Sequence, residues 1–196
     1  METVDQLTND LVIRKKLLNE LHQEQIKDSS TVIIPELEIC MGYARADIVM
    51  VNGSIHGFEI KSDKDTLERL THQIGYYEQV FEHVTIVCGK THVDKAKLIV
   101  PPWWEVAEAI YDDTGNIVLK KIKDGSQNSV LDAASVAQLL WRDEALEALK
   151  KRGIDRGVKS KPRRFILERL IDNVSLEELL AITRHAMKAR LDWRTV

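Results

Sequence analysis

The sequence predicts an α/β fold followed by a small all-helical part, and two patterns support this prediction. Apolar residues recur at helical spacing over about residues 5–24 and again from Asp63, whereas short β-rich runs lie between and after these segments. Beyond residues 123–129, which form the expected linker, every apolar pattern is helical. We therefore expect a domain over 1–124 and a helical domain over 125–196.

Taken in order, the elements before the linker alternate in type. After the first helix, TVIIPELEI is a predicted strand, and ADIVMV and IHGFEIK form a hairpin around the turn residues Asn52-Gly53-Ser54. A helix is expected from Asp63, followed by the apolar strand HVTIVCG. A short helix (93–98) and a second hairpin (106–111 and 117–122) complete this part. The core order is then α-β-β-β-α-β.

The helical part contains three expected helices, over 130–151, 163–172 and 176–190. Its charge also differs from that of the first part: residues 1–124 hold 14 Lys+Arg against 21 Asp+Glu, while 125–196 hold 14 against 10. A basic arm on an acidic domain favours a polyanion such as DNA as partner, with an uneven but ordinary surface as the alternative.

Composition excludes several other classes. Cys40 and Cys88 have no partners at zinc-ligand spacing, and two cysteines make no disulfide framework. Neither a signal peptide nor an apolar run of membrane-spanning length is found, so we expect a cytoplasmic protein that does not bind membranes. No histidine pattern indicates a zinc site, and any metal should therefore be one that prefers oxygen ligands.

The first hairpin carries the candidate chemistry. With a three-residue loop, Val51 faces Ile55, which places Asp47 opposite Glu59 and Arg45 opposite Lys61. Two opposed carboxylates repel each other unless a cation lies between them, and magnesium or manganese would supply that cation. Lys61 would then contact a phosphate or the attacking water. The alternative is a surface salt bridge on an edge strand.

These residues resemble the PD-(D/E)XK nuclease superfamily, in the stretch IPELEICMGYARADIVMVNGSIHGFEIKSDKDTLERLTHQIGYY. The resemblance covers about residues 5–90 and implies a restriction-endonuclease-like core with a mixed central sheet. It also implies a deoxyribonuclease in which Asp47 and Glu59 bind metal and Lys61 is catalytic. E-I-K-S-D, D-T-L-x-R-L and P-x-W-W are similar to segments of a largely uncharacterised bacterial and phage group of that superfamily.

The same resemblance suggests further site residues. Gln73 and Tyr77 match the Q-x-x-x-Y helix of RecB-like nucleases. We expect Gln73 at the site, and for Tyr77 we favour a position in the core. An additional acid often precedes the Asp in this superfamily. We favour Glu36 over Glu38 and Glu20 as a third metal ligand, while a solvated face is the alternative for all three.

Nucleic-acid contacts are expected from basic and aromatic residues. Trp103 and Trp104 can stack on unpaired bases, although packing against the core is the favoured interpretation. The candidate backbone contacts, against the alternative of a solvated loop, are Arg45, Lys150, Lys151, Arg152, Arg156, Lys159, Lys161, Arg163 and Arg164. Two other functions remain open: a catalytically silent nucleic-acid-binding module on the same fold, and a protein-interaction module.

Overall fold

The computed structural model describes residues 7–190 as a mixed α/β structure around one six-stranded sheet. The elements are α1 (Asp10–Lys27), β1 (Val32–Ile39), η1 (Cys40–Gly42), β2 (Ala44–Val51), β3 (Ile55–Lys61), α2 (Leu70–Val80), β4 (His83–Gly89), η2 (Lys90–His92), α3 (Val93–Ile99), β5 (Glu105–Tyr111), β6 (Ile117–Lys123), α4 (Ala133–Ala137), α5 (Arg142–Lys151), α6 (Arg163–Ile171) and α7 (Leu176–Ala189).

The strands lie in the sheet in the same order as in the chain. Hairpin connections make β1, β2 and β3 antiparallel neighbours, and β6 pairs antiparallel with β5. The helices α2 and α3 are crossovers, so β3–β4 and β4–β5 are parallel. The observed order through β4 is α-β-β-β-α-β, as predicted, and the sheet is mixed.

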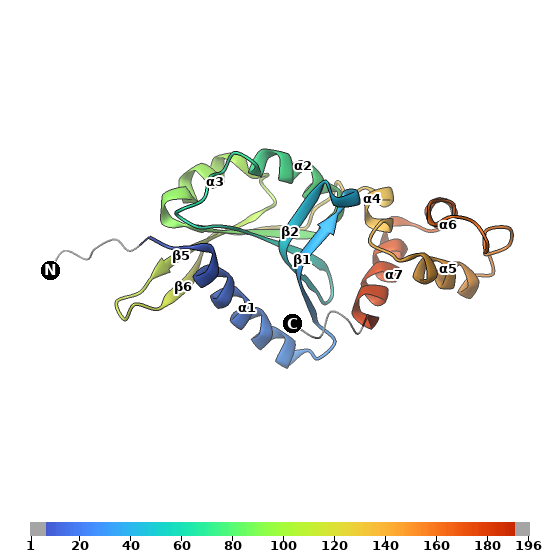
Figure 1. The fold of residues 1–196 in the computed structure, drawn as a ribbon, viewed down its shortest axis with the longest axis horizontal. Coiled ribbons are helices and arrows are strands. Elements are labelled where there is room, and N and C mark those ends of the chain that lie inside the picture. The colour runs from blue at the N-terminus through green and yellow to red at the C-terminus, as the bar shows by residue number, and fades with distance from the viewer. Residues whose placement is uncertain (1–6, 191–196) are drawn as a thin grey trace.

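Helices cover both faces of the sheet (Figure 1). On one face α1 buries Ile13, Leu17 and Leu21 in a cluster with apolar residues of β1, β2, β3, β4 and β5. These three positions are four residues apart and therefore form one helical stripe. On the other face, α2 and α3 share a continuous hydrophobic core with the C-terminal helices. Figure 1 shows α5 and α6 extending beyond the β1 side of the sheet.

Two helices begin later in the chain than predicted. Residues 5 and 6 lie outside the described residues, and α1 begins only at Asp10 because the Asn9 side chain caps it through Val12 N (3.2 Å). The second helix begins at Leu70, not at Asp63. Asp63 accepts hydrogen bonds from the backbone and hydroxyl groups of Thr8 and Thr91, which hold the segment after β3 in turns.

The predicted helix over 130–151 is also wrong as a single element, because α4 and α5 are separate. The Trp141 backbone N–H donates to Glu144 Oε2 (2.7 Å), so a new helix begins there. Arg163 donates to the Leu140 carbonyl (2.9 Å), which a continuous helix would use internally. Among the described residues, no helix combines the length and apolar character that a membrane span requires.

Candidate functional site

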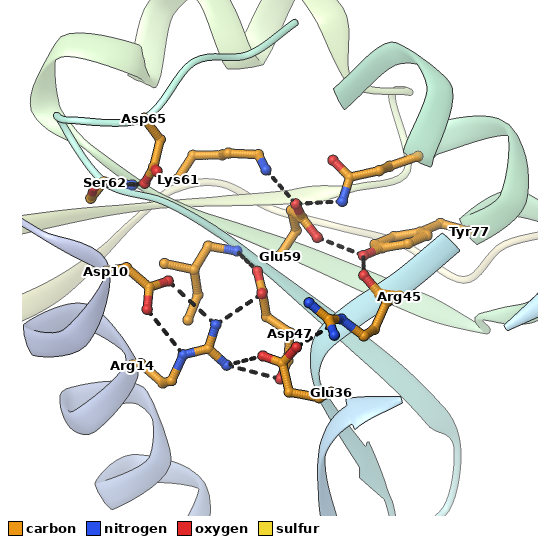
Figure 2. Close-up of polar contacts among 12 residues, drawn as sticks. Asp10, Arg14, Glu36, Arg45, Asp47, Glu59, Lys61, Ser62, Asp65 and Tyr77 are labelled. Atoms are coloured by element: carbon orange, nitrogen blue, oxygen red, sulfur yellow. Dashed lines mark hydrogen bonds and ion pairs between the residues drawn. The ribbon is translucent and has the colours of Figure 1, made fainter. Parts of the chain in front are cut away.

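The site lies where β2 and β3 separate. Their ladder runs from Val51–Ile55 to Ile48–Phe58, which confirms the three-residue loop and the predicted register over these residues. The ladder ends before the predicted pairs Asp47–Glu59 and Arg45–Lys61. The next residue on β2, Asp47, inserts its carboxylate between the strands and accepts from Ile60 N (2.8 Å). The Asp47 side chain thus takes the place of a backbone ladder bond. Polar side chains gather where the two strands separate (Figure 2).

Glu59 is the buried centre of the site, with only 1% of its surface exposed. Its Oε1 accepts hydrogen bonds from Gln73 Nε2 (2.8 Å) and Lys61 Nζ (2.6 Å), and its Oε2 accepts from the Tyr77 hydroxyl (2.5 Å). Burial raises the pKa of this carboxyl, and Asp47 raises it further, whereas Lys61 and Tyr77 lower it. A neighbouring cation would therefore stabilise the charged form.

Tyr77 belongs to both the core and the site. Its ring is fully buried and stacks on Trp104, as the core interpretation predicts. Its hydroxyl donates to Glu59 Oε2 and also lies 3.0 Å from the Arg45 carbonyl oxygen; with one proton it can donate to only one of the two at a time. Burial and the Glu59 charge raise the pKa of Tyr77, so the phenol stays protonated. The i, i+4 spacing from Gln73 was the sequence signal that pointed to this position.

Arg14 of α1 is a central residue that the sequence interpretation missed. Its guanidinium contacts Asp10 (3.1 Å), Glu36 (3.0 Å) and Asp47 (2.9 Å), and it also donates to the Asp47 carbonyl (Figure 2). Partial burial alone would lower the pKa of Arg14, but its bonds to Asp10 and Asp47 outweigh burial and raise it. The only local sequence signal was the Asp10–Arg14 spacing of four residues.

Glu36 occupies an irregular position on β1. Its φ of 54° lies in the left-handed region, and it is missing from a ladder that is regular on both sides. Val32 and Ile34, which precede Glu36, pack into the core shared with α2 and the C-terminal helices, and so do Leu37 and Ile39, which follow it. The residues that face this core therefore change from even to odd positions at Glu36. The strict alternation that placed Glu36 and Glu38 on one face is therefore interrupted at Glu36 itself.

The Glu36 carboxylate is held by two arginines, Arg14 at 3.0 Å and Arg45 at 2.8 Å. Arg45 is 61% exposed at its side chain, so it remains accessible from solvent. Of the other candidate acids, Glu20 pairs with Lys16 on α1 (3.1 Å) and Glu38 lines the cleft described next.

A mainly polar cleft of about 720 Å³ opens over these groups. It contains the predicted residues Asp47, Glu59, Lys61 and Gln73. Its complete lining is Asp10, Glu38, Gly42, Tyr43, Ala44, Arg45, Asp47, Glu59, Ile60, Lys61, Asp65, Arg69, His72, Gln73 and Tyr76.

The two central carboxylates have the chemistry to hold one divalent ion. A carboxylate offers about four lone-pair positions; the contacts above use two on Asp47 and three on Glu59. Gln73 Oε1 is buried and finds no hydrogen-bond donor among residues 7–190, which leaves an acceptor open beside them. No group of three or more metal-binding side chains occurs in the described chain, so water and substrate oxygens would complete the shell.

The predicted basic residues of the C-terminal part lie at the surface, but several have intramolecular contacts. Arg152 binds Glu178, and Lys159 binds Asp155. Lys150 lies 3.8 Å from Glu147, Arg163 donates to backbone carbonyls and Arg164 lies over the Phe165 ring. Lys151, Arg156 and Lys161 are exposed on the same segment.

The tryptophans pack against the core, as favoured from the sequence. Trp104 is fully buried, and Trp103 is partly buried against the same cluster. Neither of them lines the cleft. Cys40 and Cys88 are buried thiols, and burial raises the pKa of both.

Comparison with known proteins gives one family and two individual similarities. The chain is 28% identical to "Protein cII" of Enterobacteria phage P4 over 185 residues, which covers 94% of this chain and 69% of that protein. It is also similar to a solved structure, the SPO1766 protein of unknown function from Silicibacter pomeroyi, at 16% identity and a TM-score of 0.40, covering 70% of this chain and 87% of the other. The model of the bacteriophage P4 protein cII family matches residues 4–194, so the chain belongs to that family.

Proposed function

We propose that this protein is a magnesium- or manganese-dependent nuclease that hydrolyses DNA phosphodiester bonds, on a restriction-endonuclease-like core. The observation that carries the proposal is the contact of Lys61 Nζ with Glu59 Oε1 (2.6 Å) in the cleft that also contains Asp47. The α-β-β-β-α-β order and the register of the hairpin support it. Burying an acid–lysine pair carries a desolvation cost, and here the pair lines a mainly polar cleft.

Each residue has a distinct role in this proposal. Asp47 and Glu59 would hold the ion, which when bound would polarise the phosphate and supply a reactive water. Tyr77 and Gln73 fix the orientation of the Glu59 carboxylate by donating to its two oxygens. Arg14 and Ile60 N fix Asp47 in the same way. Lys61 would turn from Glu59 toward a phosphate oxygen or orient the attacking water.

The test is incubation of the full chain with linear, circular and single-stranded DNA in magnesium or manganese. Lys61→Met keeps both carboxylates, so metal binding should persist while cleavage falls by about 10²–10⁴-fold. Asp47→Asn removes a negative ligand and should lower both metal affinity and cleavage. Lys64→Met is the matched control, because Lys64 is an exposed lysine outside the cleft lining. Folding of each variant is verified by its melting temperature.

If Lys61→Met and Asp47→Asn both cut DNA as fast as the wild type, the proposed site is not responsible for the activity. The second candidate function, a catalytically silent module that binds nucleic acid or protein, would then replace the first. One observation favours it: Asp47 and Glu59 already have internal cations, Arg14 and Lys61, as partners. In a silent module these two cations would neutralise the carboxylates without a metal ion.

The basic segment gives DNA binding a separate test. The described part of this segment, residues 125–190, shares the hydrophobic core with α2, so deleting it would expose apolar surface. Neutralising charges in the full chain is therefore the better perturbation. Changing Lys151, Arg156 and Lys161 to Gln should flatten the salt dependence of duplex binding by up to about 0.9 per lost phosphate contact. The control changes three exposed lysines elsewhere, Lys15, Lys95 and Lys120. Equal slopes in both triple variants would assign the segment to a different partner.

A further inference from the structure

Two tyrosines form a parallel aromatic pair at the cleft. Tyr43 follows the turn η1, Tyr76 lies on α2, and their ring centroids are 6.0 Å apart with planes inclined by only 8°. Both line the cleft that contains Glu59 and Lys61. Tyr43 is 70% exposed, so one face of the pair is accessible from solvent. The pair therefore presents a flat apolar surface beside the proposed reacting groups.

The backbone before Tyr43 is held in an unusual conformation. Cys40, Met41 and Gly42 all have φ values in the left-handed region, at 49°, 59° and 85°. For the two non-glycine residues this conformation is unfavourable, so the surrounding structure has to hold it. Cys40 is buried and its thiol contacts the Tyr76 carbonyl (3.9 Å), so the turn is anchored to α2 at its first residue. The result is a fixed turn that projects Tyr43 into solvent.

Two arginines lie beside the aromatic pair. Arg45 and Arg69 line the same cleft and are exposed at the surface, while the acids of the lining are Asp10, Glu38, Asp47, Glu59 and Asp65. Aromatic rings beside arginines are a combination that binds single-stranded nucleic acid, because the rings stack on bases and the cations contact the phosphates. In a duplex the base faces are already stacked on their neighbours. Stacking on Tyr43 therefore requires an unpaired base.

We propose that Tyr43 and Tyr76 form a stacking platform for an unpaired base, and that the substrate class of this site is single-stranded nucleic acid or a frayed end. This inference rests on the proposed function, which supplies the position of the cut, and it adds the substrate class. The platform would place a base over Tyr43 while the adjoining phosphate lies toward Lys61. Arg45, near the start of β2 and in the same cleft lining, would contact the phosphate backbone.

The experiment measures binding without cleavage. Fluorescence anisotropy of a labelled single-stranded oligonucleotide and of a blunt hairpin duplex is recorded with the full chain in chelator. Tyr43→Ala should weaken single-strand binding by about 5–150-fold, which corresponds to the ~1–3 kcal/mol of one base–aromatic stack. Duplex binding should change by less than about twofold. Tyr43→Phe keeps the ring and should bind like the wild type. Tyr111→Ala, outside the cleft, is the aromatic control.

Three results would overturn the platform: no measurable single-strand binding by the wild type, unchanged single-strand affinity in Tyr43→Ala, or equal losses on single strand and duplex. Because chelator removes catalysis, these results are independent of nuclease activity. Lys61-dependent cleavage with normal binding by Tyr43→Ala refutes the platform alone. A selective loss in Tyr43→Ala without any metal-dependent cleavage by the wild type refutes the nuclease alone.

Discussion

Replacing Lys61 by Met should strongly destabilise the fold, for a reason unrelated to catalysis. Lys61 Nζ lies 2.6 Å from Glu59 Oε1, and the two side chains are only 9% and 1% exposed. Met retains the length of the aliphatic chain but leaves the Glu59 carboxylate without its cation. Removing one partner of a buried ion pair costs about 3–5 kcal/mol. We therefore expect the free energy of unfolding at pH 8 to fall by that amount.

The size of this loss should depend on pH. In Lys61→Met, burial and Asp47 raise the pKa of Glu59 with no lysine to lower it. A carboxyl whose pKa is higher in the folded than in the unfolded state favours folding when it is protonated. Its stabilising contribution is complete below the unfolded pKa and is lost as pH rises through the folded pKa. The deficit should therefore shrink between pH 8 and pH 5.

Urea unfolding without metal, followed by tryptophan fluorescence, measures this deficit at each pH beside the wild type. The double variant Glu59→Gln with Lys61→Met removes both charges and should recover most of the loss, since Tyr77 can still donate to the Arg45 carbonyl while accepting from the new amide. Lys16→Met breaks a half-exposed pair on α1 and should cost less than about 1 kcal/mol. A deficit that is independent of pH and persists in the double variant would refute the argument.

Three further predictions concern residues around the site. Gly57→Ala should cost about 1–3 kcal/mol in urea unfolding because its Cβ would lie 2.8 Å from Phe81, whereas Gly75→Ala, with open space at the same atom, should be neutral or stabilising; equal effects would contradict the packing. Arg14→Gln should increase the rise in melting temperature on adding magnesium, because the acids around Arg14 lose their internal cation; an unchanged rise would argue against a shared cation site. The pKa of His56 is lowered to about 3 by burial and by His83, so its ring should remain neutral in an NMR titration down to about pH 4, and titration near 6.5 would contradict its burial.

Local sequence patterns predicted most elements because each pattern reports a local preference. Alternating apolar residues and the turn Asn52-Gly53-Ser54 indicated the hairpin. The three-residue length of this turn indicated the register that brings Asp47 toward Glu59. The starts of helices were less predictable. Whether Asp63 begins a helix depends on Thr8 and Thr91, which are distant in sequence and capture its carboxylate.

By itself, the sequence determined the α-β-β-β-α-β order, the hairpin register and the candidate group Asp47, Glu59, Lys61 and Gln73. The tertiary structure decided what surrounds them. Arg14 reaches Asp47 only because α1 packs across the sheet, and the Glu36 carboxylate, on a residue with left-handed φ, meets Arg14 and Arg45 from two other elements. Local patterns follow from backbone geometry over a few residues. Ion pairs between distant segments depend on how the completed core places those segments, so only the folded chain defines them.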